Sequence, residues 1–201
     1  DRFVIDDTLL SPEAGGVCFD VDDDGDPDLV LGQDYSGNQV WWWENPRPDF
    51  SKPWKRRLIK DGGPRKHHDQ TAGDFDGDGR IELASWNQGG RQLLLFDVPH
   101  DPRSSGTWPY RAIFRWEGKD LEGFPSQPTD VDGDGKVDLV GGGRWFEHDG
   151  GGEFKAHVID DAMRFTQCDA GQLVAGGWPE IVFSPGDADG SGRSRVLVPP
   201  W

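Results

Sequence analysis

The chain has 201 residues and carries 37 acidic against 21 basic side chains, for a net charge of −16. This balance argues against nucleic acid as a partner, because binding to phosphates needs a basic surface. No apolar run approaches the roughly 18 residues of a membrane-spanning helix, so we expect no insertion into a membrane. The sequence shows no signal peptide and begins at Asp1, as a mature form or a piece of a longer protein would.

Short segments rich in β-branched residues recur along the chain and predict strands. Four of them open similar stretches of sequence, at residues 2–6, 56–60, 110–114 and 155–160. Two further apolar segments follow in each stretch, at 29–31 and 40–43, 83–86 and 93–96, 139–140 and 145–146, and 181–183 and 196–198. One more strand is expected between the opening segment and these two, directly before the position of the acidic loop. Each repeat therefore holds about four strands. The repeat units are about 1–54, 55–109, 110–154 and 155–201.

Units of four strands that repeat every 40–55 residues or so are typical of a β-propeller. We therefore predict an all-β fold of four-stranded antiparallel blades, with residues 1–201 as a single domain. If the opening strand of each unit is the outer strand of the preceding blade, the N-terminal strand could complete the last blade and close a ring of four. The alternative is a larger ring, for example of seven blades, to which this chain contributes four units or which several copies share as a homo-oligomer.

An acidic loop of one pattern occurs three times, at 20–28, 74–82 and 130–138. Acids stand at positions 1, 3, 5 and 9 of each loop, and position 6 is glycine, which permits a sharp turn. The three loops hold 14 acids and two bases, which accounts for −12 of the net charge of −16. Acidity this local predicts cation binding, and hard oxygen ligands at this density suit Ca²⁺ better than Mg²⁺. The alternative is three solvated turns.

An EF-hand is excluded for these loops, because it needs a glutamate at position 12 and flanking helices. Position 12 is Leu31, Ser85 and Gly141 in the three loops, and the flanking segments are strand-like.

The loop pattern, Asp-x-Asp-x-Asp-Gly-x-x-Asp/Glu-Leu, resembles the FG-GAP/VCBS repeat family, the calcium-loop β-propellers that include the integrin α-subunit head. The resemblance implies three structural calcium ions and a secreted, periplasmic or cell-surface protein. It implies side-chain ligands at Asp20, Asp22, Asp24 and Asp28, at Asp74, Asp76, Asp78 and Glu82, and at Asp130, Asp132, Asp134 and Asp138. The backbone carbonyls of Asp26, Arg80 and Lys136 would complete the three sites.

The fourth unit departs from this pattern. Glu180 matches the ninth loop position, but Ala170-Gly171-Gln172 replaces the acids that should precede it, apart from Asp169. A second acidic stretch at 187–192 has Arg195 at its ninth position, so we interpret it as a hairpin turn rather than a calcium loop.

Histidines precede the strand that leads into the second loop, in the sequence His67-His68-Asp69-Gln70. In a propeller this segment would lie at the mouth of the central channel, together with Gln127 and Gln167. A histidine there can act as a general base or hold a catalytic metal. The alternative is a surface loop with two solvated imidazoles.

Tryptophan stands beside polar residues at Trp86-Asn87 and Arg144-Trp145, a pairing that suits sugar because the indole stacks on the ring and the polar groups bond hydroxyls. The chain has 10 tryptophans, and we expect most of them in the core between blades.

Three functions are consistent with these features. We favour a calcium-stabilised binding module for carbohydrate. The second is a carbohydrate-active enzyme of polysaccharide lyase or sugar dehydratase type, with His67 or His68 as base and Tyr35, Tyr110 or Arg144 as partner. The third is an adhesion or structural domain with a protein ligand. A disulfide between Cys18 and Cys168 would favour closure of four blades, whereas two buried free thiols would not.

Overall fold

The computed structural model describes residues 3–8, 10–150, 152–185 and 195–197. In these residues the fold is all-β, with fourteen strands in four antiparallel sheets and one short 3₁₀ helix, Gln88–Gly90. The described part of the chain contains no helix long and apolar enough to cross a membrane.

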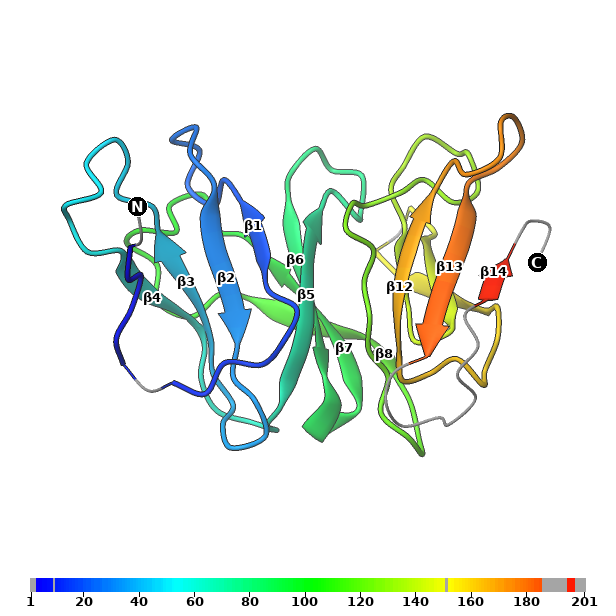
Figure 1. Ribbon diagram of the computed structural model, residues 1–201, viewed down its shortest axis with the longest axis horizontal. Coiled ribbons are helices and arrows are strands. Elements are labelled where there is room, and N and C mark those ends of the chain that lie inside the picture. The colour runs from blue at the N-terminus through cyan, green and yellow to red at the C-terminus, as the bar shows by residue number, and fades with distance from the viewer. Residues whose placement is uncertain (1–2, 9, 151, 186–194, 198–201) are drawn as a thin grey trace.

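The first two sheets have four strands each, in sequential order (Figure 1). The first contains β1 (Val17–Phe19), β2 (Asp28–Gly32), β3 (Val40–Glu44) and β4 (Lys55–Lys60). The second contains β5 (His67–Gly73), β6 (Glu82–Asn87), β7 (Gln92–Asp97) and β8 (Tyr110–Arg115). Each is a meander in which consecutive strands pair, as predicted for a blade of four strands, but the strand predicted at residues 2–6 does not form in the described residues 3–6.

The third and fourth sheets have three strands each among the described residues. They contain β9 (Leu139–Gly141), β10 (Arg144–His148) and β11 (Phe154–Val158), and β12 (Thr166–Gly171), β13 (Glu180–Pro185) and β14 (Arg195–Leu197). The prediction of four strands is therefore wrong for the third sheet, where only a single bridge from Thr129 to Asp138 marks the inner position. Pro125 and Pro128 lie in that segment, and proline cannot donate the hydrogen bond that a strand ladder needs.

The sheets are offset from the repeat units of the sequence. The segment that opens the second unit forms β4 and pairs with β3, so it is the outer strand of the first sheet. In the same way β8 and β11 are the outer strands of the second and third sheets. The opening strand of each of these units thus belongs to the preceding sheet, which is the condition that closure by the N-terminus would require.

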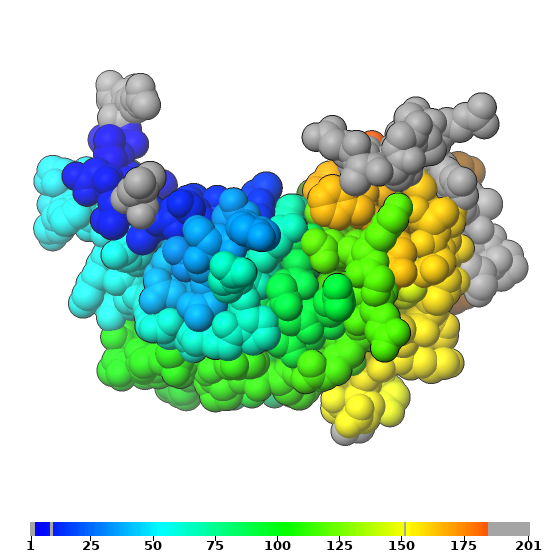
Figure 2. Space-filling view, turned by 90° about the horizontal axis from the view of Figure 1, so that it is seen from below, coloured from blue at the N-terminus to red at the C-terminus, as the bar shows by residue number. Residues whose placement is uncertain are grey.

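The N-terminal segment does not close a ring, however. Residues 3–8 form no strand, and the Asp6 carboxylate accepts hydrogen bonds from Trp43 Nε1 at 2.9 Å and Arg56 Nη1 at 2.7 Å. The segment therefore lies against β3 and β4 instead of completing the last sheet. In Figures 1 and 2 the first and last sheets stand at opposite ends of an arc, which corrects the expectation of a closed ring of four blades.

Three apolar clusters hold neighbouring sheets together. The cluster between the first and second sheets includes Trp42, Ile59 and Leu94, and that between the second and third includes Trp86, Leu95 and Phe146. The third, between the last two sheets, includes Val140, Ile181 and Phe183. Of the nine tryptophans that the structure describes, seven are buried, as expected, namely Trp41, Trp42, Trp43, Trp86, Trp108, Trp116 and Trp145.

Cys18 and Cys168 are free thiols, so the disulfide that would have favoured four-blade closure does not form. Cys18 is exposed rather than buried, whereas Cys168 is partly buried in the third apolar cluster.

Candidate metal-binding loops

The three acidic loops follow the innermost strand positions of the first three sheets. Residues 20–27 join β1 to β2, residues 74–81 join β5 to β6, and residues 130–138 lead from the Thr129 bridge to β9. In each loop three carboxylates bring one oxygen each to within 4.8 Å of the others. These groups are Asp20, Asp22 and Asp28; Asp74, Asp76 and Asp78; and Asp130, Asp132 and Asp138.

One pattern of hydrogen bonds shapes all three loops. The carboxylate at position 1 accepts from the N–H of the position-6 glycine, in the pairs Asp20–Gly25 at 2.8 Å, Asp74–Gly79 at 3.0 Å and Asp130–Gly135 at 2.9 Å. The carboxylate at position 9 accepts from the N–H of position 2, in the pairs Asp28–Val21 at 3.2 Å, Glu82–Phe75 at 2.9 Å and Asp138–Val131 at 2.8 Å. The position-6 glycines have φ of +90°, +87° and +90°, the left-handed region that the sharp turn requires.

The buried carboxylates of these loops fit a cation. Burial raises the pKa of Asp28, Glu82 and Asp138 to about 7, and the nearby loop carboxylates act in the same direction. Asp22 Oδ1 and Asp74 Oδ1 are buried without a hydrogen-bond donor, whereas Asp22 Oδ2, which also has no aligned donor, faces the Arg103 guanidinium. A buried oxygen with no donor is costly unless a positive charge faces it. A hard cation would satisfy this donor set.

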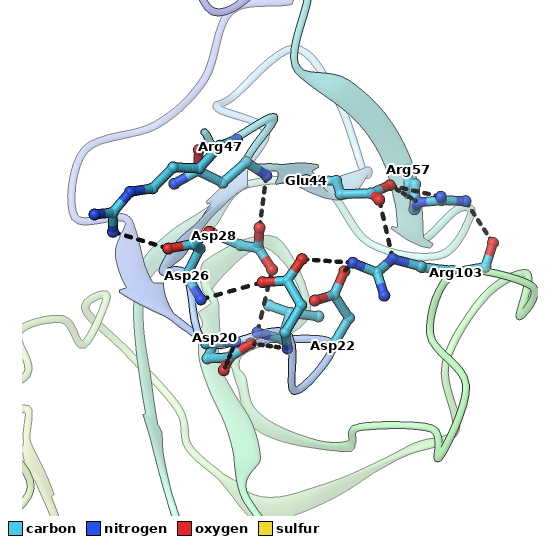
Figure 3. Close-up of polar contacts among 12 residues, drawn as sticks. Asp20, Asp22, Asp26, Asp28, Glu44, Arg47, Arg57 and Arg103 are labelled. Atoms are coloured by element: carbon cyan, nitrogen blue, oxygen red, sulfur yellow. Dashed lines mark hydrogen bonds and ion pairs between the residues drawn. The ribbon is translucent and has the colours of Figure 1, made fainter. Parts of the chain in front are cut away.

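The first loop differs from the others because an arginine reaches it from the second sheet (Figure 3). Arg103, in the connection between β7 and β8, places Nη2 2.8 Å from Asp22 Oδ2 and 2.6 Å from Asp24 Oδ2. Its Nε donates to Glu44 at 2.9 Å, and Glu44 in turn accepts from Arg57. The guanidinium thus lies beside two of the expected calcium ligands.

The fourth unit keeps only the acid at the ninth position of the loop pattern, Glu180. Glu180 Oε2 accepts from the N–H of Leu173 at 2.8 Å, the same contact that position 9 makes in the three acidic loops. Counting back eight residues places Gln172 at position 1. Its amide nitrogen donates to the carbonyls of Val174 and Gly176, the latter at 3.1 Å. A neutral amide donor therefore stands where the other loops have a carboxylate, and the stretch 187–192 lies outside the described residues.

Comparison with known families agrees with the loop geometry. Residues 20–85 match the family model of the FG-GAP-like repeat. The matched stretch contains the first two acidic loops and the strands from β2 into β6. Searches of curated proteins and of solved structures gave no match.

Several residues that the sequence suggested for ligand binding are buried in the protein. Trp86 is 0 % exposed and donates its indole N–H to the Gly123 carbonyl at 3.0 Å. Trp145 is buried and stacks on His157, with ring centroids 4.2 Å apart. Neither indole face is free for a sugar, so the structure corrects both assignments.

Polar neighbours of these tryptophans are also committed to internal contacts. Asn87 donates to the carbonyls of Pro64 and Arg65. Arg144 donates to the Gly142 carbonyl at 2.6 Å and pairs with Asp161. The sequence identified polar side chains next to aromatic ones, but it could not indicate that these side chains donate their hydrogen bonds to backbone carbonyls.

His67 is a structural residue. It is 0 % exposed, and its Nε2 lies 3.1 Å from Asn87 Nδ2, an amide that can only donate. Burial, with the charge of Lys60, lowers the pKa of His67 to about 3. The imidazole is therefore neutral at physiological pH and out of reach of a substrate.

His68 lies among three carboxylates. Asp69 is its neighbour in β5, Glu13 precedes β1, and Glu122 lies between β8 and β9. Its Nδ1 lies 2.9 Å from Asp69 Oδ2, an ion-pair distance rather than an aligned hydrogen bond. Its Nε2 lies 3.4 Å from Glu122 and 3.7 Å from Glu13. Burial alone would lower the pKa of His68, but the carboxylate of Asp69, with the charges of Glu122 and Glu13, raises it above its ordinary value.

The sequence predicted that residues 67–70 would lie close to Gln127 and Gln167, and the structure shows part of this grouping. Asp69, Gln70 and Gln167 line one hollow of about 350 Å³, together with Cys18 and Phe124. Gln127 does not line it, and Gln70 bonds internally to Gly32, His67 and Ser85.

Proposed function

We propose that this chain is a calcium-stabilised binding module with a carbohydrate ligand, exposed at the cell surface, secreted or periplasmic. The observation that supports calcium most directly is the convergence of three carboxylates in each of three loops, with one buried oxygen of Asp22 and one of Asp74 (Oδ1 in both) that lack a donor. The FG-GAP-like repeat over residues 20–85 supports a binding or adhesion role of the propeller type.

Calcium would supply positive charge to each loop and remove the repulsion between its carboxylates. The first, third, fifth and ninth positions would provide side-chain oxygens, and Asp26, Arg80 and Lys136 would provide carbonyls. Each loop connects an innermost strand position to the next strand of its sheet, so a bound ion would fix the two strands in register. The role we propose for the metal is therefore structural rather than catalytic.

A thermal melt in calcium and in excess EGTA tests this role. Each site filled at a hundredfold excess over its Kd adds about 2.7 kcal/mol to the free energy of unfolding. For a chain of this size about 1 kcal/mol shifts the melting temperature by roughly 2–4 °C, so three sites predict a loss of many degrees in EGTA. A titration by calorimetry gives the number of ions, with Mg²⁺ as the comparison. An unchanged melt in EGTA would contradict the proposal.

Carbohydrate remains the ligand that we propose, although the tryptophans first considered are buried. Screening on a glycan array, together with pull-down of protein partners, separates this proposal from a protein-binding adhesion domain. The enzyme alternative needed a histidine that converges with a tyrosine or an arginine. Among the described residues, His68 faces carboxylates and the Phe165 ring, and His67 is buried, so no observation favours that alternative.

A further inference from the structure

The two ends of the second sheet differ in charge. At one end the acidic loop 74–81 joins β5 to β6. At the other end residues 61–66, the turn 88–91 and the residues after β8 come together, and Figure 2 views the molecule from this end. This second end carries the features that lead to the inference.

Two adjoining hollows form a groove at that end, with volumes of about 270 and 560 Å³. They share Gly89 and Arg91, so they flank the turn 88–91. The side chains that give the groove its character are Tyr35, Arg65, Lys66, Arg91, Arg115 and Trp116. Two carboxylates, Asp120 and Glu117, also line it, and Lys66 pairs with Asp120 at 3.2 Å. Four cations against two acids make the groove basic in a chain of net charge −16.

Backbone hydrogen bonds bring together the segments that carry these cationic residues. The N–H of Gln88 donates to the Lys66 carbonyl at 2.8 Å, and the N–H of Gly89 donates to the Arg65 carbonyl at 3.0 Å. A Cβ at Gly89 would lie 2.3 Å from the Arg65 oxygen, so the turn can approach only because this residue is glycine. The N–H of Trp116 donates to the Arg91 carbonyl at 3.2 Å, which ties the end of β8 to the same turn.

Lys66 and Arg91 hold unusual backbone conformations. Their φ angles are +65° and +48°, and they are two of the five non-glycine residues with positive φ in the described part of the chain. Side chains other than glycine avoid this region, and where the surroundings enforce it the residue is often at a ligand site. The strain here falls on two of the four cations of the groove.

We propose that this groove binds an acidic polysaccharide, a chain of sugar rings that carry carboxylate groups. The proposal rests on the carbohydrate-binding function above and specifies the class of sugar. Guanidinium groups match carboxylates with paired hydrogen bonds, which suits Arg65, Arg91 and Arg115. The Arg65 guanidinium lies 5.3 Å from the centre of the Tyr35 ring, and Tyr35 is 68 % exposed. An exposed aromatic ring beside fixed cations can stack on a sugar while the cations pair with its carboxylate.

The acidic loops do not repel such a ligand. Strand β6 has six residues and separates the two ends of the sheet by about 20 Å. The screening length at physiological ionic strength is about 8 Å, so the charge of the loops is largely screened at the groove.

Calorimetry with defined oligosaccharides tests the proposal in excess calcium, which keeps the loops filled. The acidic probes are hexasaccharides of hyaluronan, alginate and pectate, and the neutral probes are maltohexaose and cellohexaose. We expect binding of an acidic probe, weakening with added salt, and no binding of the neutral ones. Arg65→Gln and Arg91→Asn should each weaken binding by about tenfold, the effect of one lost charge-assisted hydrogen bond. Asparagine is chosen at position 91 because it tolerates the left-handed backbone.

Lys52→Gln is the matched control, since it removes one exposed cation elsewhere and should leave binding unchanged. Melting temperatures in calcium check that all variants are folded. Equal binding of neutral and acidic probes, or no effect of the groove variants, would overturn the inference and leave a carbohydrate-binding module. Failure of every glycan on an array would overturn both, and binding of an acidic peptide or an oligonucleotide in place of the glycans would overturn the class of ligand.

Discussion

The guanidinium of Arg103 lies 2.8 Å from the Asp22 carboxylate and joins the second sheet to the first acidic loop. The Asp22 side chain is only 1 % exposed, and neither of its oxygens has an aligned hydrogen-bond donor. The contacts of the other two loops with cations are weaker or more exposed. Arg111 lies 3.8 Å from Asp76, and Lys136 pairs with Asp134, whose side chain is 39 % exposed.

Replacement of Arg103 by alanine should strengthen calcium binding at the first loop. In the native chain an ion must displace the guanidinium from Asp22 and Asp24, whereas the second and third loops impose no comparable step. We therefore expect a calcium titration with two tighter sites and one weaker site. In Arg103→Ala the weak site should gain about tenfold in affinity, since an arginine salt bridge to a buried carboxylate is worth roughly 1.5–3 kcal/mol.

Arg47→Ala is the control for this experiment. Arg47 pairs with the Asp26 side chain at 2.8 Å in the same loop, but only the carbonyl of Asp26 is an expected ligand. Its removal should leave all three affinities close to native. Weaker calcium binding in Arg103→Ala would mean that the arginine supports the site instead of competing for it.

Removal of the carboxylate at the ninth loop position should reduce the number of bound calcium ions in the three acidic loops but not in the loop of the fourth unit. Glu82→Gln removes a buried carboxylate from the second loop, so we expect the number of bound calcium ions to fall by one. Glu180→Gln removes the corresponding carboxylate of the fourth unit, where the amide of Gln172 already donates to the loop carbonyls. We expect that variant to bind as many ions as the native chain, although its melting temperature falls because the N–H groups of Leu173 and Val174 then donate to a neutral amide oxygen instead of a carboxylate. Equal loss of calcium in both variants would contradict this distinction.

The sequence predicted the repeat architecture well because it depends on local signals. Loop spacing, glycine at the sixth position and β-branched segments identified four sheets and the three loops with convergent carboxylates. The absence of an inner strand before the third loop was also visible in principle, as Pro125 and Pro128. The ring was harder to predict, since closure depends on where residues 3–8 pack, and Asp6 binds Trp43 and Arg56 through contacts remote in sequence.

Side-chain roles at the site were less predictable than the loops. Trp86 beside Asn87 suggested a sugar platform, yet both are buried: Trp86 packs against Phe146 of the third sheet, and Asn87 bonds to the carbonyls of Pro64 and Arg65. The interaction of Arg103 with Asp24 spans 79 residues and has no local signature. The basic groove was missed for the same reason, since Tyr35, Arg65 and Arg91 come from three separate connections.

Trp86→Ala should destabilise the protein by about 3–5 kcal/mol, the usual cost of removing a large buried side chain. Trp86 packs against Trp116, Phe124 and Phe146 between the second and third sheets. Trp86→Phe keeps much of this packing and should cost less, mainly through the lost hydrogen bond to Gly123. Denaturant unfolding in calcium measures both. Glycan binding by Trp86→Phe should equal that of the native chain, and a selective loss of binding would restore a ligand role.

The stability of the protein should also depend on the charge of His68. Its side chain is 11 % exposed and faces Asp69, Glu122 and Glu13, while Phe165 packs on the ring without a charge. A histidine whose pKa is raised in the folded state stabilises the fold fully below its ordinary value of 6.5, and this contribution is lost as the pH rises through the folded pKa. Each unit by which the pKa is raised corresponds to about 1.4 kcal/mol.

A pH series in excess calcium isolates this effect, because bound metal keeps the loop carboxylates ionised. We expect the native chain to lose stability as the pH rises above 6.5, and His68→Gln to be less stable at low pH but nearly independent of pH in this range. Titration of the imidazole by NMR measures the cause directly. Glu122→Gln should lower the pKa of His68, since it removes a charge 3.4 Å from Nε2. His67, buried and neutral, should not titrate above pH 4 and serves as the internal comparison. A His68 that titrates below its ordinary value would show that burial, not the three carboxylates, dominates this cluster.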